Sequence, residues 1–221
     1  SRTPERPAQT MCSGGSMRKG SLGAWRQLGA KAGAPKPGKG APIAVDFGAS
    51  ALKVFQLTSG EPHGIGAAAA IDTPDDLLDD PSARLAFQTQ HLPGLIRGGG
   101  FKGKRAVCLI PACLTHTTHV QVPKGDAATV ESSAKLAVAT QLSCAPDALV
   151  VRHQEVGPAH ESGKTEVITI AASRGVVGRL MSGLAAAKLE PVGMRTEAVA
   201  LLRGFSTLKL TSEDDVCLYL D

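Results

Sequence analysis

A tight turn between two apolar runs is the feature that most constrains how this chain folds. Residues 43–47 and 51–58 have the apolar and β-branched composition of strands, and Gly48-Ala49-Ser50 separates them. A third run of this kind covers residues 64–71, and the polar turn 59–63 connects it to the second. The pattern predicts an antiparallel three-stranded meander.

Downstream of the meander, strand-like and helical patterns alternate, which indicates an α/β fold. Pro93 is expected to kink or end the first helix, because proline lacks the backbone donor that a helix interior needs. Asp126 and Ser173 are expected to cap two later helices. The expected strands are 106–110, 116–122, 149–156, 166–172 and 216–221, and the expected helices begin near residues 82, 126, 173 and 196.

Charge, cysteine content and apolar run lengths indicate which partners and which cellular compartment to expect. Residues 1–42 contain eight basic residues and one acidic residue, whereas the rest of the chain contains 16 basic and 19 acidic residues. We therefore interpret residues 1–42 as a disordered basic leader, and no nucleic-acid partner is expected. The five cysteines form no C-x-x-C pair and no secretory signal is evident, so a reducing cytoplasm is expected. The longest uncharged apolar stretch, 64–71, is far shorter than the ~20 residues of a membrane-spanning helix.

Two segments come close to the phosphate-binding P-loop pattern without matching it. Residues 33–40 have the glycine and lysine spacing but end in glycine, so the Mg²⁺-binding hydroxyl is missing. Residues 157–165 have the hydroxyl but are one residue too long, and a strand follows them. Both are interpreted as turns or linkers. Cys113, His116 and His119 are not expected to bind a metal, because residues three apart on a strand face opposite ways.

The strongest local signal for chemistry surrounds Asp46. A strand delivers this carboxylate to its end, and the turn Gly48-Ala49-Ser50 then exposes backbone N–H groups that can bind phosphate oxygens. The carboxylate can hold Mg²⁺ through water, and Lys53 can add a positive charge if strand alternation places it on the same side. A hairpin turn without a ligand explains the same residues equally well.

The layout of the whole chain resembles a known superfamily. A strand ending in Asp46, a helix opened by Glu197 and a strand ending in Asp221 resemble the actin-like ATPases, which have an RNase H-like fold. Among these the chain most resembles the PilM-like proteins of type IV pilus assembly, which are related to FtsA and to part of the type II secretion protein GspL. The resemblance covers residues 43–221. It implies an actin-like subdomain at 43–111, an inserted α+β subdomain at 112–172, and a return to the first subdomain at 173–221, where the chain is expected to stop before a second domain.

The resemblance also implies roles for individual residues. Asp46 looks like the first phosphate-loop acid, with Gly48, Ala49 and Ser50 lining the phosphates of ATP and Lys53 beside them. Asp221 looks like the acid that opens the second phosphate loop, so Asp46 and Asp221 would hold Mg²⁺. Glu197 looks like the acid that positions water or metal, which makes Glu197 and Asp46 the candidate catalytic residues.

The function that the resemblance implies is an ATP-binding scaffold in the cytoplasm, peripheral at the inner membrane. In PilM-like proteins a groove near the inserted subdomain takes the N-terminal peptide of the inner-membrane protein PilN. ATP turnover is expected to be slow or absent, and formation of a homo-oligomer is left open. Two alternatives remain: an interaction module with a vestigial nucleotide site, and a small-molecule kinase of the same superfamily.

Overall fold

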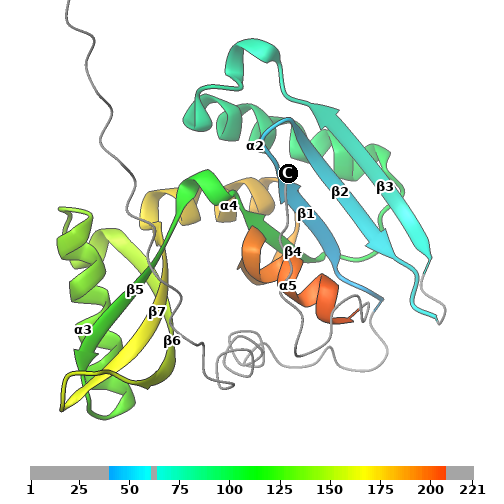
Figure 1. Ribbon diagram of the computed structural model, residues 1–221. Coiled ribbons are helices and arrows are strands. Elements are labelled where there is room, and N and C mark those ends of the chain that lie inside the picture. The colour runs from blue at the N-terminus through cyan, green and yellow to red at the C-terminus, as the bar shows by residue number, and fades with distance from the viewer. Residues whose placement is uncertain (1–39, 61–63, 208–221) are drawn as a thin grey trace, which may run out of the picture.

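Two β-sheets organise the chain, and each sheet packs against helices (Figure 1). The computed structural model describes residues 40–60 and 64–207. The expected leader, the expected strand at 216–221 and Asp221 lie outside the described residues, apart from positions 40–42 of the leader. The mixed α/β class expected from the sequence is confirmed.

The first sheet has five strands in the order β3-β2-β1-β4-β8. β1 pairs antiparallel with β2 and parallel with β4, and β8 pairs parallel with β4. The expected meander of β1, β2 and β3 is confirmed. The strands span β1 Ile43–Phe47, β2 Ala51–Leu57, β3 Ile65–Asp72, β4 Arg105–Ile110 and β8 Glu190–Thr196.

β8 was not expected from the sequence. Pro191 and Gly193 interrupt its apolar pattern, and both residues are uncommon inside strands. The pairing with β4 shifts register between Ala106 and Val107, which accommodates the irregular strand. Tertiary pairing therefore overrides a weak local preference here.

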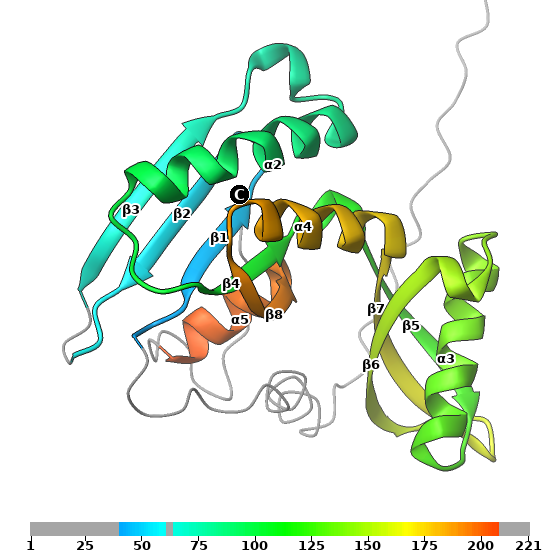
Figure 2. The same ribbon diagram turned by 180° about the vertical axis from the view of Figure 1, so that it is seen from behind.

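Helices cover both faces of the first sheet. α2 Pro81–Gly98 and α4 Arg174–Ala186 pack on one face, and α5 Glu197–Thr207 lies on the other (Figures 1 and 2). The main core lies under α2 and α4. Its largest fully buried members are Ile43, Phe47, Leu52, Leu85, Leu92, Leu180 and Leu184.

The helix α2 continues through Pro93, so of the two expected outcomes the end of the helix is wrong, and the kink stays a prediction. Proline in a helix interior costs roughly 3 kcal/mol of helix stability. Here Leu92 is fully buried on one side of the proline, and Leu95 and Ile96 pack against the same core on the other. Burial of these side chains offsets the cost of the missing hydrogen bond.

The second sheet has three strands in the order β5-β7-β6, and one helix covers one of its faces. β5 spans Thr115–Pro123, β6 Leu149–Pro158 and β7 Lys164–Ser173, and the helix α3 spans Ala127–Gln141. The carboxylate of Asp126 accepts a hydrogen bond from the Thr129 amide at 2.8 Å, so the expected cap is confirmed. Single 3-10 turns precede α2, β5 and β6 at Asp75–Leu77, Ala112–Leu114 and Pro146–Ala148.

No helix in the described part of the chain has both the length and the apolar character that crossing a membrane requires. The subdomain boundaries at 111/112 and 172/173 stay predictions.

Candidate functional site

The candidate phosphate loop lies at the carboxyl edge of the first sheet. Because β1, β4 and β8 are parallel, the segments that follow them emerge at the same edge. Asp46 is the penultimate residue of β1, and Gly48 opens the turn to β2. Glu197 directly follows β8 as the first residue of α5. The fold therefore brings Glu197 to the same edge as Asp46 and Gly48, from which it is far apart in the sequence.

One transverse row of the sheet gathers the charged side chains. Lys53 on β2 pairs with Asp46 on β1, and Asp46 pairs in turn with Leu109 on β4. Leu109 pairs with Arg195 on β8, so all four side chains lie on the face that carries α5. Strand alternation therefore places Lys53 on the same side as Asp46. The sequence analysis missed Arg195, which no local motif distinguishes.

Burial shifts the pKa values of two side chains in this row, the half-buried Asp46 and Arg195. Burial raises the pKa of Asp46, the nearby Lys53 lowers it, and the like charge of Glu197 raises it further. Burial also lowers the pKa of Arg195, with the positive charge of Arg203 on α5 adding to the effect. A bound divalent cation would relieve the unfavourable burial of Asp46.

The turn after Asp46 is tightly enclosed on one side. A Cβ added to Gly48 would lie 3.0 Å from the carbonyl oxygen of Ala51 and 3.7 Å from a carboxylate oxygen of Asp46. Ala49 and Ser50 are exposed. The turn thus presents an open rim of small residues to solvent above a carboxylate, which suits the approach of a phosphate group.

Two polar residues hold this turn in place, and the sequence analysis did not identify them. The side-chain amide of Gln88 on α2 donates to the backbone carbonyl of Gly48 at 2.8 Å and to the hydroxyl of Thr73 at 3.1 Å. The Thr73 amide donates to the Ser50 carbonyl at 2.8 Å. Gln88 lies on the same helical stripe as Leu85 and is only 1% exposed. A glutamine within an apolar stripe was the available signal.

The described residues contain no cluster of three or more His, Cys, Asp or Glu side chains suited to a metal ion. Of the two Mg²⁺ ligands expected from the sequence, Asp46 lies at the loop and Asp221 lies outside the described residues. His116 and His119 pair with Ala171 and Ile168, respectively, and so lie on opposite faces of β5, as the sequence predicted.

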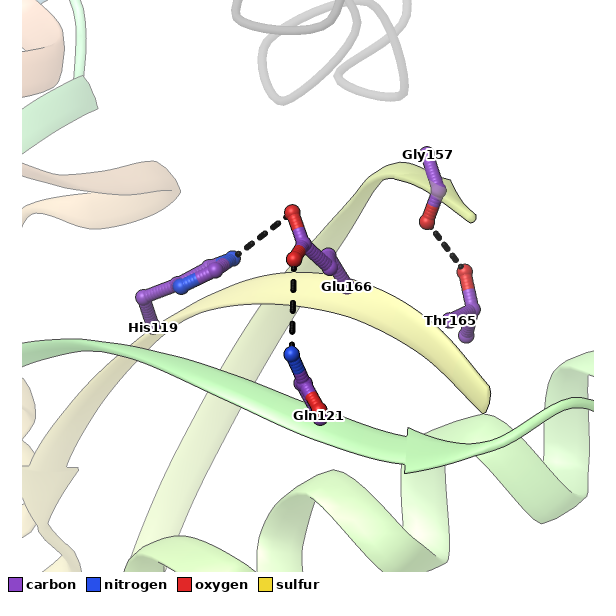
Figure 3. Close-up of polar contacts among 5 residues, drawn as sticks. All are labelled: His119, Gln121, Gly157, Thr165 and Glu166. Carbon is purple, nitrogen blue, oxygen red and sulfur yellow. Dashed lines mark hydrogen bonds and ion pairs between the residues drawn. The ribbon is translucent and has the colours of Figure 1, made fainter. Parts of the chain in front are cut away.

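The segment 157–165 belongs to the hairpin of β6 and β7, which the sequence analysis interpreted as a turn: residues 159–163 form the turn, and the residues on either side of it pair as strands. Figure 3 shows how its hydroxyl is used: Thr165 donates to the carbonyl of Gly157 at 2.9 Å. The same figure shows His119 and Gln121 of β5 directed toward Glu166 of β7, at 3.5 Å and 3.4 Å. These residues lie on the face of the second sheet that α3 leaves open.

A small pocket of about 110 Å³ lies where the two sheets meet. Its walls are largely apolar, and they include Ile110, Ile170 and Val199. Arg152 and Arg195 also line it, and the buried hydroxyl of Thr196 has no hydrogen-bond partner there. The pocket is therefore largely apolar, with two arginines among its lining residues and one buried hydroxyl whose hydrogen-bonding capacity is unused.

The pocket continues into the open face of the second sheet. Ile170 pairs with Thr117 on one side and with Arg152 on the other, so one row of this face borders the pocket. The next row contains Ile168 and His119, and the row beyond it contains Glu166. This open face is apolar beside the pocket and polar at its far end.

Comparison with known proteins identifies the fold. No protein-family model matches the chain, and no curated protein matches it. A structure described as the PilM-PilN type IV pilus biogenesis complex is similar, with a TM-score of 0.59 and 24% identity over 77% of this chain and 50% of that one. The cytoplasmic domain of EpsL, an inner membrane component of the type II secretion system of Vibrio cholerae, matches with a TM-score of 0.50 and 11% identity. That match covers 70% of this chain and 56% of the EpsL chain.

The chain therefore has the fold of PilM-like and EpsL-like proteins, and the resemblance expected from the sequence is confirmed at the level of the fold. The chain spans about half the length of the solved structures that it matches.

Proposed function

We propose that this chain is part of a PilM-like scaffold of a type IV pilus or type II secretion assembly. In this proposal the open face of the second sheet docks the N-terminal peptide of a PilN-like inner-membrane protein, and the Asp46 loop binds Mg-ATP. The scaffold then works at the cytoplasmic side of the inner membrane through its partner. The single observation that carries the proposal is the apolar pocket between the two sheets, in a fold shared with a protein solved together with PilN.

The chemistry of the pocket supports a peptide ligand. Ile110, Ile170 and Val199 provide an apolar site for one aliphatic side chain. The exposed guanidinium of Arg152 can bind the backbone or a polar side chain of the same peptide. The open face leading away from the pocket supplies further length for an extended segment.

The residues around Asp46 fit a nucleotide phosphate. The backbone amides of the turn 48–50 would contact phosphate oxygens, with Lys53 balancing their charge. Asp46 would hold Mg²⁺ through water, and Glu197 would orient a water molecule. When bound, Mg-ATP would supply the phosphate oxygens and the metal ion that these residues would hold. Glu197 is the candidate base in this proposal, and slow or absent turnover is expected.

Peptide binding tests the docking proposal. The probe is a synthetic peptide of the N-terminal segment of a PilN-like protein from the same organism, and isothermal titration calorimetry is the measurement. Arg152→Glu reverses an exposed charge at the pocket. It is expected to weaken binding at least tenfold, because the peptide group that contacts Arg152 would be repelled by the new carboxylate or left without a partner. Lys124→Glu makes the same reversal at an exposed position outside the pocket and is expected to change affinity less than twofold. Equal affinities of the two variants would refute the docking site.

Nucleotide binding is tested separately in the full-length protein. Asp46→Ala is expected to abolish Mg-ATP binding while thermal unfolding stays cooperative. If the wild-type protein binds the peptide but no Mg-ATP, the interaction module with a vestigial nucleotide site is the better description. If phosphate release depends on an added metabolite, the kinase alternative is favoured.

A further inference from the structure

A second hollow lies at the opposite, amino-terminal edge of the first sheet. Its volume is about 670 Å³, within the usual range for small-molecule sites. Lys102, Lys104 and Arg105 line it together with one acid, Glu190. Since β1 is five residues long, this edge is roughly 15 Å from the Asp46 loop.

The walls of this hollow are held by a buried side chain. The amide nitrogen of Gln56 donates to the carbonyls of Ala41 and Lys102, each at 2.8 Å, and its oxygen accepts from the Lys102 amide at 2.8 Å. Gln56 is 7% exposed and comes from β2. In the loop that lines the hollow, Gly100 and Gly103 have φ angles of 73° and 80°, a backbone conformation that is strained for residues other than glycine. The loop is therefore built in one shape before any ligand arrives.

The side chains that line the hollow carry more positive than negative charge. One guanidinium nitrogen of Arg105 (Nη1) is buried and has no hydrogen-bond partner. Among the described residues no ion pair joins Lys102, Lys104 or Arg105 to an acid, although Arg105 and Glu190 are paired in register on neighbouring strands. The carboxyl end of α2 at Gly98 adds about half a negative charge. Together with Glu190 this balances about half of the three positive charges.

We propose that this hollow binds a phosphate group. A guanidinium presents its N–H donors in a planar fork that matches two phosphate oxygens, and lysines add flexible charge around it. An anion there would pair with Lys102, Lys104 and Arg105, which no acidic side chain of the described residues neutralises by an ion pair. The phosphate can belong to a soluble phosphate ester or to an anionic lipid headgroup. Leu57 and Ile65, which are 38% and 72% exposed beside the hollow, are where acyl chains would lie in the second case.

Phosphate binding is tested by titrating the ¹⁵N-labelled full chain with inorganic pyrophosphate at constant ionic strength. The expected result is saturable amide shifts within residues 100–105. Lys102→Gln with Lys104→Gln is expected to weaken this binding at least tenfold. Both lysine side chains are exposed and the Gln56 contacts involve only the backbone of Lys102, so the fold is expected to persist. The matched control is Lys124→Gln with Lys135→Gln, two lysines beside the second sheet and away from the hollow, which is expected to bind as the wild type does.

Vesicle cosedimentation separates the two sources of phosphate. Binding to phosphatidylglycerol vesicles but not to phosphatidylcholine vesicles, lost in the Lys102/Lys104 variant, supports a lipid headgroup. Pyrophosphate binding without vesicle binding supports a soluble ester. The inference is overturned if residues 100–105 do not shift, or if the Lys102/Lys104 variant and the control bind pyrophosphate equally. Shifts confined to residues 48–50 would overturn this site and leave the proposed nucleotide loop standing.

Discussion

Replacing Gln88 with leucine is expected to loosen the turn that follows Asp46. The Gln88 amide donates to Gly48 at 2.8 Å and to Thr73 at 3.1 Å, and the side chain is 1% exposed. Leucine has a similar size but leaves the Gly48 carbonyl without this donor. A buried group left unpaired costs about 1–3 kcal/mol, whereas the Thr73 hydroxyl can rotate to another partner. We expect the free energy of unfolding to fall by about 1–3 kcal/mol, which lowers the melting temperature by roughly 3–10 °C.

Urea unfolding followed by circular dichroism measures this change, and the chain offers a matched control. Gln90 lies on the same helix but is exposed, so Gln90→Leu is expected to change the free energy by less than about 0.5 kcal/mol. Thr73→Val combined with Gln88→Leu should cost less than the two single changes added together, because both act on one hydrogen-bond network. If Gln88→Leu is as stable as Gln90→Leu, Gln88 does not hold the turn.

Three further predictions concern a titration, two glycines and two cysteines. Burial raises the pKa of Asp46, so the folded state binds the proton more tightly than the unfolded chain and stability falls as the pH rises from 3.8 through the raised value. Asp46→Asn should therefore be more stable than the wild type at pH 7 and no more stable below pH 3.8, as denaturation at both values would show. On α4, Gly178→Ala should stabilise the folded protein by about 0.5–1 kcal/mol, because the added Cβ would meet no atom within 4 Å. Gly183→Ala on the same helix should destabilise it, because the added Cβ would lie 2.7 Å from a side chain on α2. Differential scanning calorimetry checks both signs, and equal melting temperatures would contradict the packing described. Burial raises the pKa of Cys108 to about 12, so iodoacetamide at pH 8 should label the exposed Cys113 and leave Cys108 unlabelled in the folded protein, as peptide mass spectrometry can show.

Local sequence patterns predicted most of the secondary structure for physical reasons that act over a few residues. Alternating burial defines β1 and β2, and the side chains of Asp126 and Ser173 cap α3 and α4 because they accept hydrogen bonds from nearby amides. The same approach failed at Pro93, where burial of Leu92 and its neighbours maintains a helix that the local rule would end.

The sequence by itself determined which residues could carry the candidate chemistry, because an acid followed by a glycine turn is a local pattern. Only the tertiary structure decided which of them meet. Pairing of β1 with β2 places Lys53 beside Asp46, and the parallel run of β1, β4 and β8 brings Glu197 to the same edge. The structure also added Arg195, Gln88 and the cationic hollow around Arg105. No local motif distinguishes these residues, since their positions depend on strand register and helix packing between segments far apart in the chain.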